Sequence, residues 1–493
     1  MSAGATLFAG CQPEVAAGPD GRILAVGEGA RAAAGRGAEV VPLRGTALPG
    51  LIDSHIHLEG LADDHMTLDV AGAASLEEAL ERVEAWAARL ARDAWVVGAG
   101  WYNDGWSNAA FPTRRQLDVA AGGRPVYLER KDGHSAWVSS AALELAGIGP
   151  ETEDPAGGVI DRDGRRRPTG ILRETAMHAV SDILPRTADA DLDAAMADAL
   201  AGLSELGITS VHSMDRARGF ASLQRLHSAG RLPIRVTYNL PLADLHHAER
   251  LGVRSGWGDE WLRIWGVKAF LDGSLGSRTA EMLDGSGTSR LPQEELVDMI
   301  DRCVQAELNV CLHAIGDGAV RRALDALARR RPAWRYWRPR IEHAQCVHPK
   351  DVLRFAKMGV IASMQPIHAV ADRELADRHW ASVVTQSYAW GALAHAGTVL
   401  AFGSDAPVET ADPLLGIDAA TTWRRRAGWH PELAISRAKA LRAYTVNAAY
   451  AVGMEQHLGS LRLRKLCDIT VVDEGRVVAT IVGGRVSWRR TPR

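Results

Sequence analysis

This chain contains several short apolar segments. Each of them ends in a residue that could bind a metal ion or transfer a proton. The first covers 47–57 and ends in two histidines separated by one residue. Four more, each typical of a β-strand, lie at 264–268, 309–313, 340–343 and 399–405. The last three alternate with expected helices, as at 318–330 and 349–358. This alternation predicts parallel β/α units, and therefore an α/β protein built as a closed (β/α)8 TIM barrel.

The two histidines at the end of the first segment are His55 and His57. Side chains two positions apart in a strand point to the same face, so the two imidazoles would meet at one point. Imidazole is the commonest nitrogen ligand of zinc and related ions, and the pair therefore indicates a metal site. A solvated turn or a buried core histidine remains an alternative in a chain with 17 histidines.

The other strand-like segments each supply one further candidate. They contain or end in Lys268, His313, His343 and Asp405. In a (β/α)8 barrel the functional groups gather at the carboxyl ends of the strands, and all of these candidates occupy such positions. We therefore expect them to form one site together with His55 and His57.

Lys268 is unusual for its residue type and its surroundings. The 57 basic residues include only six lysines, so arginine fills most cationic positions. Burial in an apolar strand lowers the pKa of an amine, and the neutral amine can add carbon dioxide to form a carbamate with two oxygens. Such a carbamate could hold two cations. The alternatives are a lysine that extends to solvent or one that pairs with Asp272.

Six sequence motifs spread over most of the chain resemble those of the metal-dependent amidohydrolase superfamily. They are PGLIDSHIH at 49–57, DGHSAW at 132–137, VKAFLDGSLGSRTA at 267–280, HAIGD at 313–317, IEHAQ at 341–345 and GSDAPVE at 403–409. In combination they are most similar to the YtcJ-like branch, which is related to the N-substituted formamide deformylases.

This resemblance implies a centre of two divalent metal ions. It places His55 and His57 on one ion, His313 and His343 on the other, and a carbamate on Lys268 between them. Asp405 would lie beside a bridging hydroxide. Zinc is the expected metal, but the same ligands also accept manganese, iron or nickel.

Asp405 is the expected general acid and base. Neighbouring cations would keep its carboxylate ionised, so it could accept a proton from the attacking water and pass it to the leaving nitrogen. Its alternative role is to cap a helix that begins at Pro407.

Four further residues are candidates for binding substrate: His134, Trp101, Asp272 and Arg278. His134 resembles the substrate-facing histidine of related proteins, although a histidine in a turn would look the same. Asp272 and Arg278 lie in a glycine-rich loop directly after the Lys268 segment, where barrel loops cover the pocket. Trp101, with Trp106 and Trp137, could line an apolar cleft, although core packing is the usual role of tryptophan.

Composition limits the other classes of function. A net charge of −3 gives no reason to expect nucleic acid or membrane partners, so we expect a small-molecule substrate, with a homodimer left open. Five cysteines without paired spacing favour a reducing compartment. Without a recognisable signal peptide or a run long enough to span a membrane, the expected location is cytoplasmic.

Strand-like segments with glycine-rich turns also occur at both ends of the chain. Residues 1–48 and 458–493 are each too short for a core of their own, so we expect one small β-sandwich built from both termini. The barrel would span 49–457. Residues from about 60 to 185 interrupt the alternation of strands and helices. They therefore predict an inserted lobe that helps cover the pocket.

The sequence thus predicts a metal-dependent hydrolase that cleaves a non-peptide carbon–nitrogen bond, either an amide or an N-formyl group. One alternative is a one-metal deaminase of an amino-heterocycle. Such enzymes share the His-x-His pair but use a His-x-x-Glu helix, and here His313 is followed by Ala314, Ile315 and Gly316. The other alternative is a non-catalytic binding protein on the same barrel.

Overall fold

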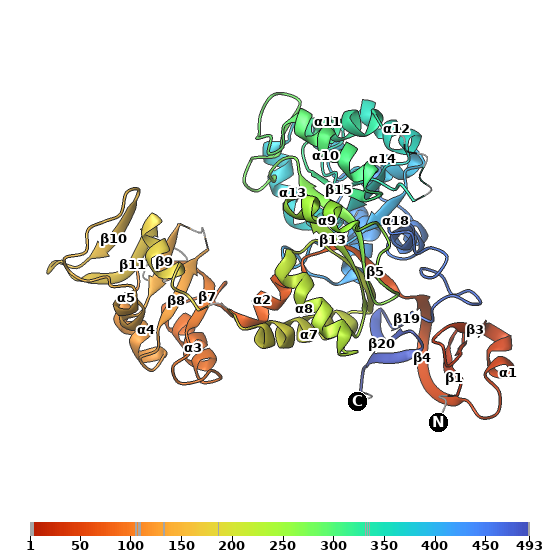
Figure 1. The fold of residues 1–493 in the computed structure, drawn as a ribbon, viewed down its shortest axis with the longest axis horizontal. Helices are drawn as coiled ribbons and strands as arrows, with labels where there is room; N and C mark the ends of the chain where they lie inside the picture. Colours follow the sequence, from red (N-terminus) through yellow and green to blue (C-terminus); the bar gives the residue numbers. More distant parts are fainter. Residues whose placement is uncertain are drawn as a thin grey trace. The chain divides into compact units, whose positions relative to one another are not determined.

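The computed structural model describes residues 4–491 except 104–105, 107–109, 132–133, 186, 331, 333 and 335. The chain forms two compact units, shown with their elements in Figure 1. One comprises Met1–Leu61 and Met196–Arg493, and the other is an insertion, Ala62–Ala195.

The larger unit is built around an eight-stranded parallel sheet that curls into a barrel, with strand order β18-β17-β16-β15-β14-β13-β12-β5. The strands are β5 (Leu51–Ile56), β12 (Ile208–Ser213), β13 (Arg235–Pro241), β14 (Leu262–Phe270), β15 (Asn309–Ala314), β16 (Arg340–His343), β17 (Ile361–Met364) and β18 (Leu400–Phe402). Every residue of β5, β12, β15, β16, β17 and β18 is buried, as expected for parallel strands covered by helices.

Helices connect the barrel strands and surround them. They are α7 (Asp189–Glu205), α8 (Ala217–Ser228), α9 (Leu245–Leu251), α10 (Gln293–Gln305), α11 (Asp317–Ala328), α12 (Pro349–Met358), α13 (His368–His379), α14 (Trp390–His395), α15 (Pro413–Asp418), α16 (Arg424–Arg426), α17 (Arg437–Ala443) and α18 (Val446–Ala451). The helices expected at 318–330 and 349–358 are therefore present as α11 and α12. The latter begins with proline and is followed by Gly359, whose left-handed φ of 71° favours glycine.

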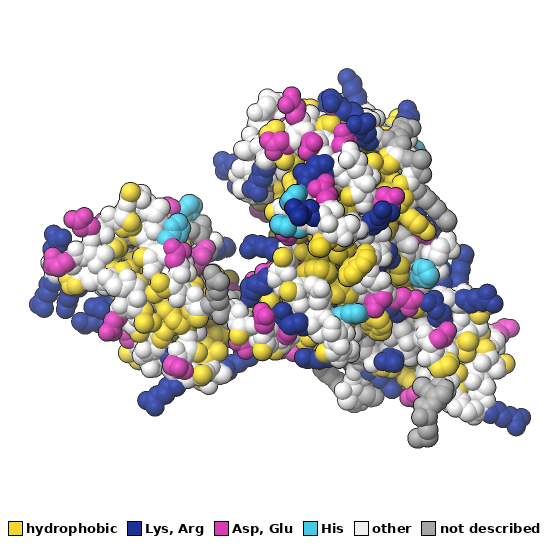
Figure 2. All heavy atoms as spheres, viewed as in Figure 1, with side chains coloured by type: hydrophobic (Ala, Val, Ile, Leu, Met, Phe, Trp, Pro, Cys, Tyr) yellow, Lys and Arg dark blue, Asp and Glu magenta, His cyan; other side chains and the backbone are white. Residues whose placement is uncertain are grey.

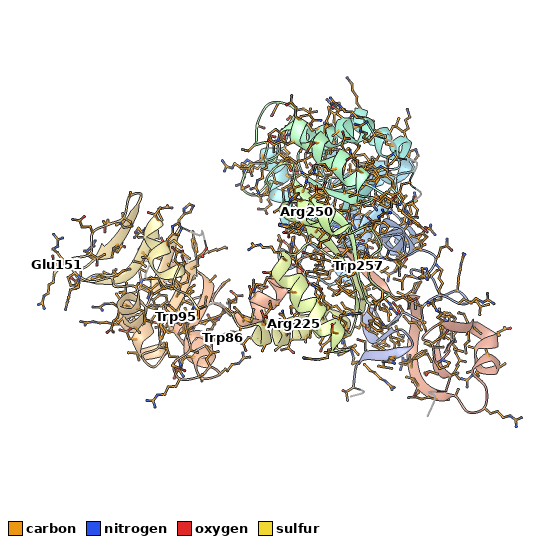
Figure 3. All side chains as sticks on the ribbon, in the orientation of Figure 1. Trp86, Trp95, Glu151, Arg225, Arg250 and Trp257 are labelled. Carbon is orange, nitrogen blue, oxygen red and sulfur yellow. The ribbon has the colours of Figure 1, made fainter. Side chains whose placement is uncertain are left out.

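Short helical turns complete the larger unit. They are η1 (Gly27–Gly29), η4 (Leu242–Asp244), η5 (Val384–Gln386), η7 (Pro431–Leu433) and a π-helical segment, η6 (Ala419–Trp423). The side chains of Arg225 on α8, Arg250 on α9 and Trp257 before β14 are labelled in Figure 3. On the face shown in Figure 2, basic and acidic side chains are interspersed around exposed apolar ones.

Both ends of the chain contribute to a seven-stranded sheet with the order β21-β20-β19-β4-β1-β2-β3. Its strands are β1 (Thr6–Gln12), β2 (Val15–Ala17), β3 (Ile23–Val26), β4 (Glu39–Pro49), β19 (Ile469–Asp473), β20 (Arg476–Val482) and β21 (Arg485–Arg489), with α1 (Ala30–Ala34) after β3. Strand β4 pairs with β1 on one side and with β19 on the other, so the two termini share one core.

The inserted unit has a six-stranded mixed sheet with the order β10-β11-β9-β8-β7-β6. The strands are β6 (Leu68–Asp69), β7 (Val96–Trp101), β8 (Val126–Arg130), β9 (Ser135–Val138), β10 (Gly158–Arg162) and β11 (Pro168–Glu174). Its helices are α2 (Leu58–Met66), which leads into the unit, α3 (Leu76–Ala87), α4 (Arg114–Ala120), α5 (Ser140–Leu145), η3 (Thr175–Met177) and α6 (His178–Ser181). Two apolar clusters of its own give this unit its core.

The predicted fold class is confirmed: a (β/α)8 barrel carries a small β domain formed by both termini and an inserted lobe. All five cysteines are buried and free, so no disulfide stabilises the chain. Among the described residues, no helix is both long and apolar enough to span a membrane.

Candidate metal centre

Six barrel residues predicted from the sequence come from the carboxyl-terminal half or end of five strands. They are His55 and His57 at the end of β5, Lys268 in β14, His313 in β15, His343 at the end of β16, and Asp405 just after β18. Parallel strands of a barrel direct these ends to one face, which explains why residues up to hundreds of positions apart in sequence meet there.

Asp405 joins the two histidines of β5. Its Oδ1 lies 3.1 Å from His57 Nε2 and 3.4 Å from His55 Nε2. The Nζ of Lys268 lies 3.2 Å from the same His55 nitrogen. One imidazole nitrogen is therefore close to both a carboxylate and an amine.

The other two histidines continue the cluster. The ring centroids of His55 and His343 are 4.8 Å apart, and those of His343 and His313 are 4.5 Å apart. One ligand atom from each of His55, His343 and Asp405 lies within 4.8 Å of the others. The structure therefore brings together all six side chains that the sequence predicted for the metal centre.

The chemical state of these histidines suits metal binding. Burial, followed by the charge of Lys268, lowers the pKa of His55 to about 4 and that of His313 to about 3. Burial also lowers the pKa of His343. Neutral imidazoles have a lone pair for a cation, and the buried Nδ1 atoms of His313 and His343 have no hydrogen-bond partner in the described part of the chain. The residues thus fit a divalent metal ion.

Glu342 orients His55 and was missed by the sequence analysis. Its Oε2 accepts a hydrogen bond of 2.7 Å from His55 Nδ1, which leaves Nε2 free to bind a metal. Both side chains are fully buried, and Arg340 Nε lies 2.8 Å from Glu342 Oε1. Burial alone would raise the pKa of Glu342, but Arg340 and His55 hold it below its usual value. The sequence did offer one indication of this role, because Glu342 is an acidic residue next to His343 in an apolar strand.

We expect Glu342→Gln to weaken metal binding by roughly 10–100-fold, the usual cost of losing an outer partner of a metal ligand. Glutamine keeps the shape but removes the negative charge that fixes the His55 tautomer. Titration of the metal-free protein with zinc measures this affinity, and the melting temperature of the metal-free variant reports any folding defect. The exposed Glu205 provides the control, Glu205→Gln. Unchanged zinc affinity in Glu342→Gln would remove the role assigned to Glu342.

Asp53 and Gly403 hold the first and last barrel strands together beneath the centre. Asp53 Oδ1 accepts hydrogen bonds from the backbone N–H groups of His55, at 3.0 Å, and Ser404, at 3.1 Å. A Cβ at Gly403 would lie 2.5 Å from His55 N, so glycine is required for this close approach. These contacts fix the backbone that presents both His55 and Asp405.

Asp405 occupies a special backbone position. Its φ is 63°, in the left-handed region, and its N–H donates to His55 O at 2.7 Å. Burial would raise the pKa of its carboxyl group, but the hydrogen bond from His57 and the neighbouring imidazoles hold it well below the usual value. The capping alternative is wrong, because the next helix, α15, begins at Pro413 and is capped by Asp412.

Lys268 is only 3% exposed, so it does not extend to solvent. Burial lowers the pKa of its amine, while Glu342 and Asp405 oppose this effect. Among the described residues it forms no ion pair with Asp272, whose carboxylate instead accepts from the backbone N–H groups of Ile315, Gly316 and Glu281. Neither alternative for Lys268 therefore fits its position, and its amine is buried beside His55.

Asp272 and Arg278, the two substrate-binding candidates in the barrel, have different surroundings. Asp272 is fully buried, and burial raises its pKa to about 6 against the three backbone hydrogen bonds. This geometry favours a role for Asp272 in anchoring the loop. It does not favour the contact with substrate that was expected from the sequence. Arg278 is exposed and lines a surface cavity of about 650 Å³, together with Arg321 and His348. Its role in binding substrate stays a prediction.

His134 and Trp101 both belong to the inserted unit. His134 is exposed, and its Nδ1 lies 3.1 Å from Glu174 Oε1. The preceding residues of its motif, 132–133, lie outside the described part of the chain. Trp101 is fully buried against Trp137, and its Nε1 donates to Leu128 O. Trp101 is thus a core residue, whereas a substrate contact by His134 stays a prediction.

A fifth histidine lies beside the centre and was also missed. His368, the first residue of α13, is 7% exposed, and its Nε2 lies 3.7 Å from Asp405 Oδ2. Its ring centroid is 6.3 Å from that of His343. The only signal in the sequence was a histidine four residues beyond the end of a strand, β17.

A cluster of neutral histidines, a carboxylate and a buried lysine at the carboxyl ends of (β/α)8 strands defines a metal-dependent hydrolase. The model of the Amidohydrolase family matches residues 39–487. The chain therefore belongs to the amidohydrolase family, and the resemblance identified in its motifs is confirmed.

Three relatives cover most of the chain. Protein LONG AFTER FAR-RED 3 of Arabidopsis thaliana is 33% identical over 94% of this chain and 87% of its own length. The putative amidohydrolase YtcJ of Bacillus subtilis (strain 168) is 29% identical over 88% and 85%. The N-substituted formamide deformylase of Arthrobacter pascens is 29% identical over 96% and 94%.

The fold also matches a solved structure. An uncharacterized metal-dependent hydrolase from Pyrococcus furiosus superposes with a TM-score of 0.76 at 30% identity, covering 95% of this chain and 99% of that one. The match therefore extends over the barrel and the additional domains alike.

Proposed function

We propose that this hydrolase cleaves a non-peptide carbon–nitrogen bond, in an amide or an N-formyl group of a small molecule. The observation that carries the proposal is the cluster in which Asp405 and the buried amine of Lys268 both approach His55 Nε2, at 3.4 and 3.2 Å. Support for the bond class comes from the N-substituted formamide deformylase, which is similar along 96% of this chain.

Two divalent metal ions, most simply zinc, complete the proposed site. His55 and His57 would hold one ion, and His313 and His343 the other. Lys268, converted to a carbamate, would bridge them with its two oxygens, and its buried position and lowered pKa favour that reaction. When bound, such ions lower the pKa of a water molecule toward about 7 and polarise a carbonyl oxygen.

Asp405 moves the proton in this proposal. Its carboxylate, ionised because neighbouring imidazoles hold its pKa low, accepts a proton from the attacking water. The protonated Oδ then donates to the nitrogen that leaves, so that an amine departs and a carboxylic acid or formate remains. No side chain forms a covalent bond to the substrate.

Metal analysis combined with a substrate panel tests this function. After expression with added zinc, we expect close to two metal ions per chain, and hydrolysis of some amide or N-formyl substrates but of no amino-heterocycle. His55→Ala should lose metal and activity together, because it removes a direct ligand, while the exposed His246→Ala should lose neither. One metal ion, an unmodified Lys268 and deamination of a heterocycle would instead establish the one-metal deaminase.

A further inference from the structure

His368 and Gln345 form a buried pair next to the metal centre. Gln345 is 3% exposed and follows β16, and its Nε2 lies 3.3 Å from His368 Nδ1. An amide N–H can only donate, so Nδ1 of the imidazole must accept this hydrogen bond. The hydrogen of the ring is therefore on the other nitrogen, Nε2.

The Nε2–H of His368 has no hydrogen-bond partner in the described part of the chain. The Oδ2 atom of Asp405 lies 3.7 Å from this nitrogen, which is too far for a hydrogen bond. Buried donors in native proteins are nearly always paired, and exceptions concentrate at working sites. This donor therefore lacks a partner at the position where a substrate would approach Asp405.

The character of the neighbouring groups indicates what that partner is. Asp405 offers carboxylate oxygens, and the buried Nδ1 atoms of His313 and His343 have no hydrogen-bond partner in the described part of the chain. His368 is thus a hydrogen-bond donor among acceptors. A donor held rigidly in a buried site is suited to an oxygen that gains negative charge during the reaction.

We propose that His368 is a further catalytic residue, whose Nε2–H donates a hydrogen bond to the substrate carbonyl oxygen as water adds to the carbon. Gln345 is the positioning residue that fixes the imidazole tautomer. This inference rests on the proposed hydrolysis of a carbonyl compound, and assigns to that site a donor from the first residue of α13. The same tautomer excludes His368 as a metal ligand, because Nε2 has no free lone pair.

Two variants of His368 and one control variant test the proposal. His368→Leu removes the donor and should lower kcat on the best amide or N-formyl substrate of the panel by about 10²–10³-fold, the cost of losing one such donor. His368→Gln retains an N–H at similar reach and should recover part of this loss. His379→Gln, at the other end of α13, is the control and should behave as wild type. Zinc content should equal that of wild type in all three.

Binding of an analogue gives a measurement that does not require turnover. A phosphonamidate version of an N-formyl or amide substrate carries negative oxygens in place of the carbonyl. Calorimetry on the zinc-loaded proteins should show that the phosphonamidate binds more weakly to His368→Leu than to wild type. The factor should be comparable to the loss in kcat. Equal binding to wild type and His368→Leu would overturn the proposal, as would loss of zinc from His368→Leu, which would make this histidine a ligand.

The two proposals fail in different ways. If the wild-type protein hydrolysed no amide or N-formyl substrate, the proposed function would be wrong, while the analogue measurement would still decide whether His368 recognises an oxyanion. If hydrolysis occurred with His368→Leu at the wild-type kcat, only the role of His368 would fall.

Discussion

Asp405→Asn is expected to lower turnover by about 10²–10⁴-fold, the usual contribution of a general acid or base. Asparagine preserves the shape and one oxygen near His57 but cannot accept the proton of the attacking water. Metal content should fall much less than turnover, because the histidine ligands remain. Steady-state kinetics and elemental analysis of the same preparation provide the two numbers.

Two comparisons make this result specific. Asp412→Asn, seven residues further along the same loop, alters a helix cap that asparagine also fills well, and should retain activity. His57→Ala removes a metal–nitrogen bond and should lose metal first and turnover as a consequence. If excess zinc restored near-normal turnover to Asp405→Asn, this residue would be a ligand alone, and the proton would travel through another group.

Lys268→Ala should lose activity by more than the roughly 10–100-fold that removal of an outer metal partner costs, because it removes a proposed direct bridge. Metal content should fall with it. Small carboxylates such as acetate, or bicarbonate, should restore part of both, since an added anion can take the place of carbamate oxygens between two cations. Activity and zinc content measured against acetate concentration test this.

The rescue distinguishes two roles for the same side chain. A lysine that acted as a structural cation would be replaced by an added amine and not by an anion. Lys439→Ala, at an exposed lysine, is the control and should show no effect of acetate. Wild-type turnover in Lys268→Ala would refute the carbamate.

The barrel and its six principal site residues could be predicted because one periodic pattern encodes both. A buried parallel strand is a continuous apolar run, and its carboxyl end is visible in sequence as the first polar residue after that run. For His313 and His343, the position at the carboxyl end of a strand was enough to predict that both side chains lie on one face of the barrel. No pairing of distant residues had to be known in advance.

Other roles depend on pairings that sequence position does not reveal. Glu342 acts on His55, 287 residues away, and His368 is fixed by Gln345, which belongs to a different strand–helix unit. Conversely, Trp101 and Asp272 have residue types that suit binding sites but are buried among core partners or backbone donors. The residue type indicates which roles a side chain could have, and its packing in the folded protein decides between a structural and a functional role.

The hydrogen bond from Ser404 N to Asp53 Oδ1 joins residues 351 positions apart, and this has a consequence for the chain as it is synthesised. A ribosome adding about 5–20 residues per second needs roughly 20–70 s to make that stretch. During this interval β5 has no β18 beside it, and the histidine pair at the end of β5 lacks the carboxylate of Asp405. Release of a chain truncated before β18 would therefore remove both the strand that closes the barrel and Asp405, the proposed proton-transfer residue, in one event. The nascent protein therefore has His55 and His57 long before it has Asp405, the residue that completes the proposed site.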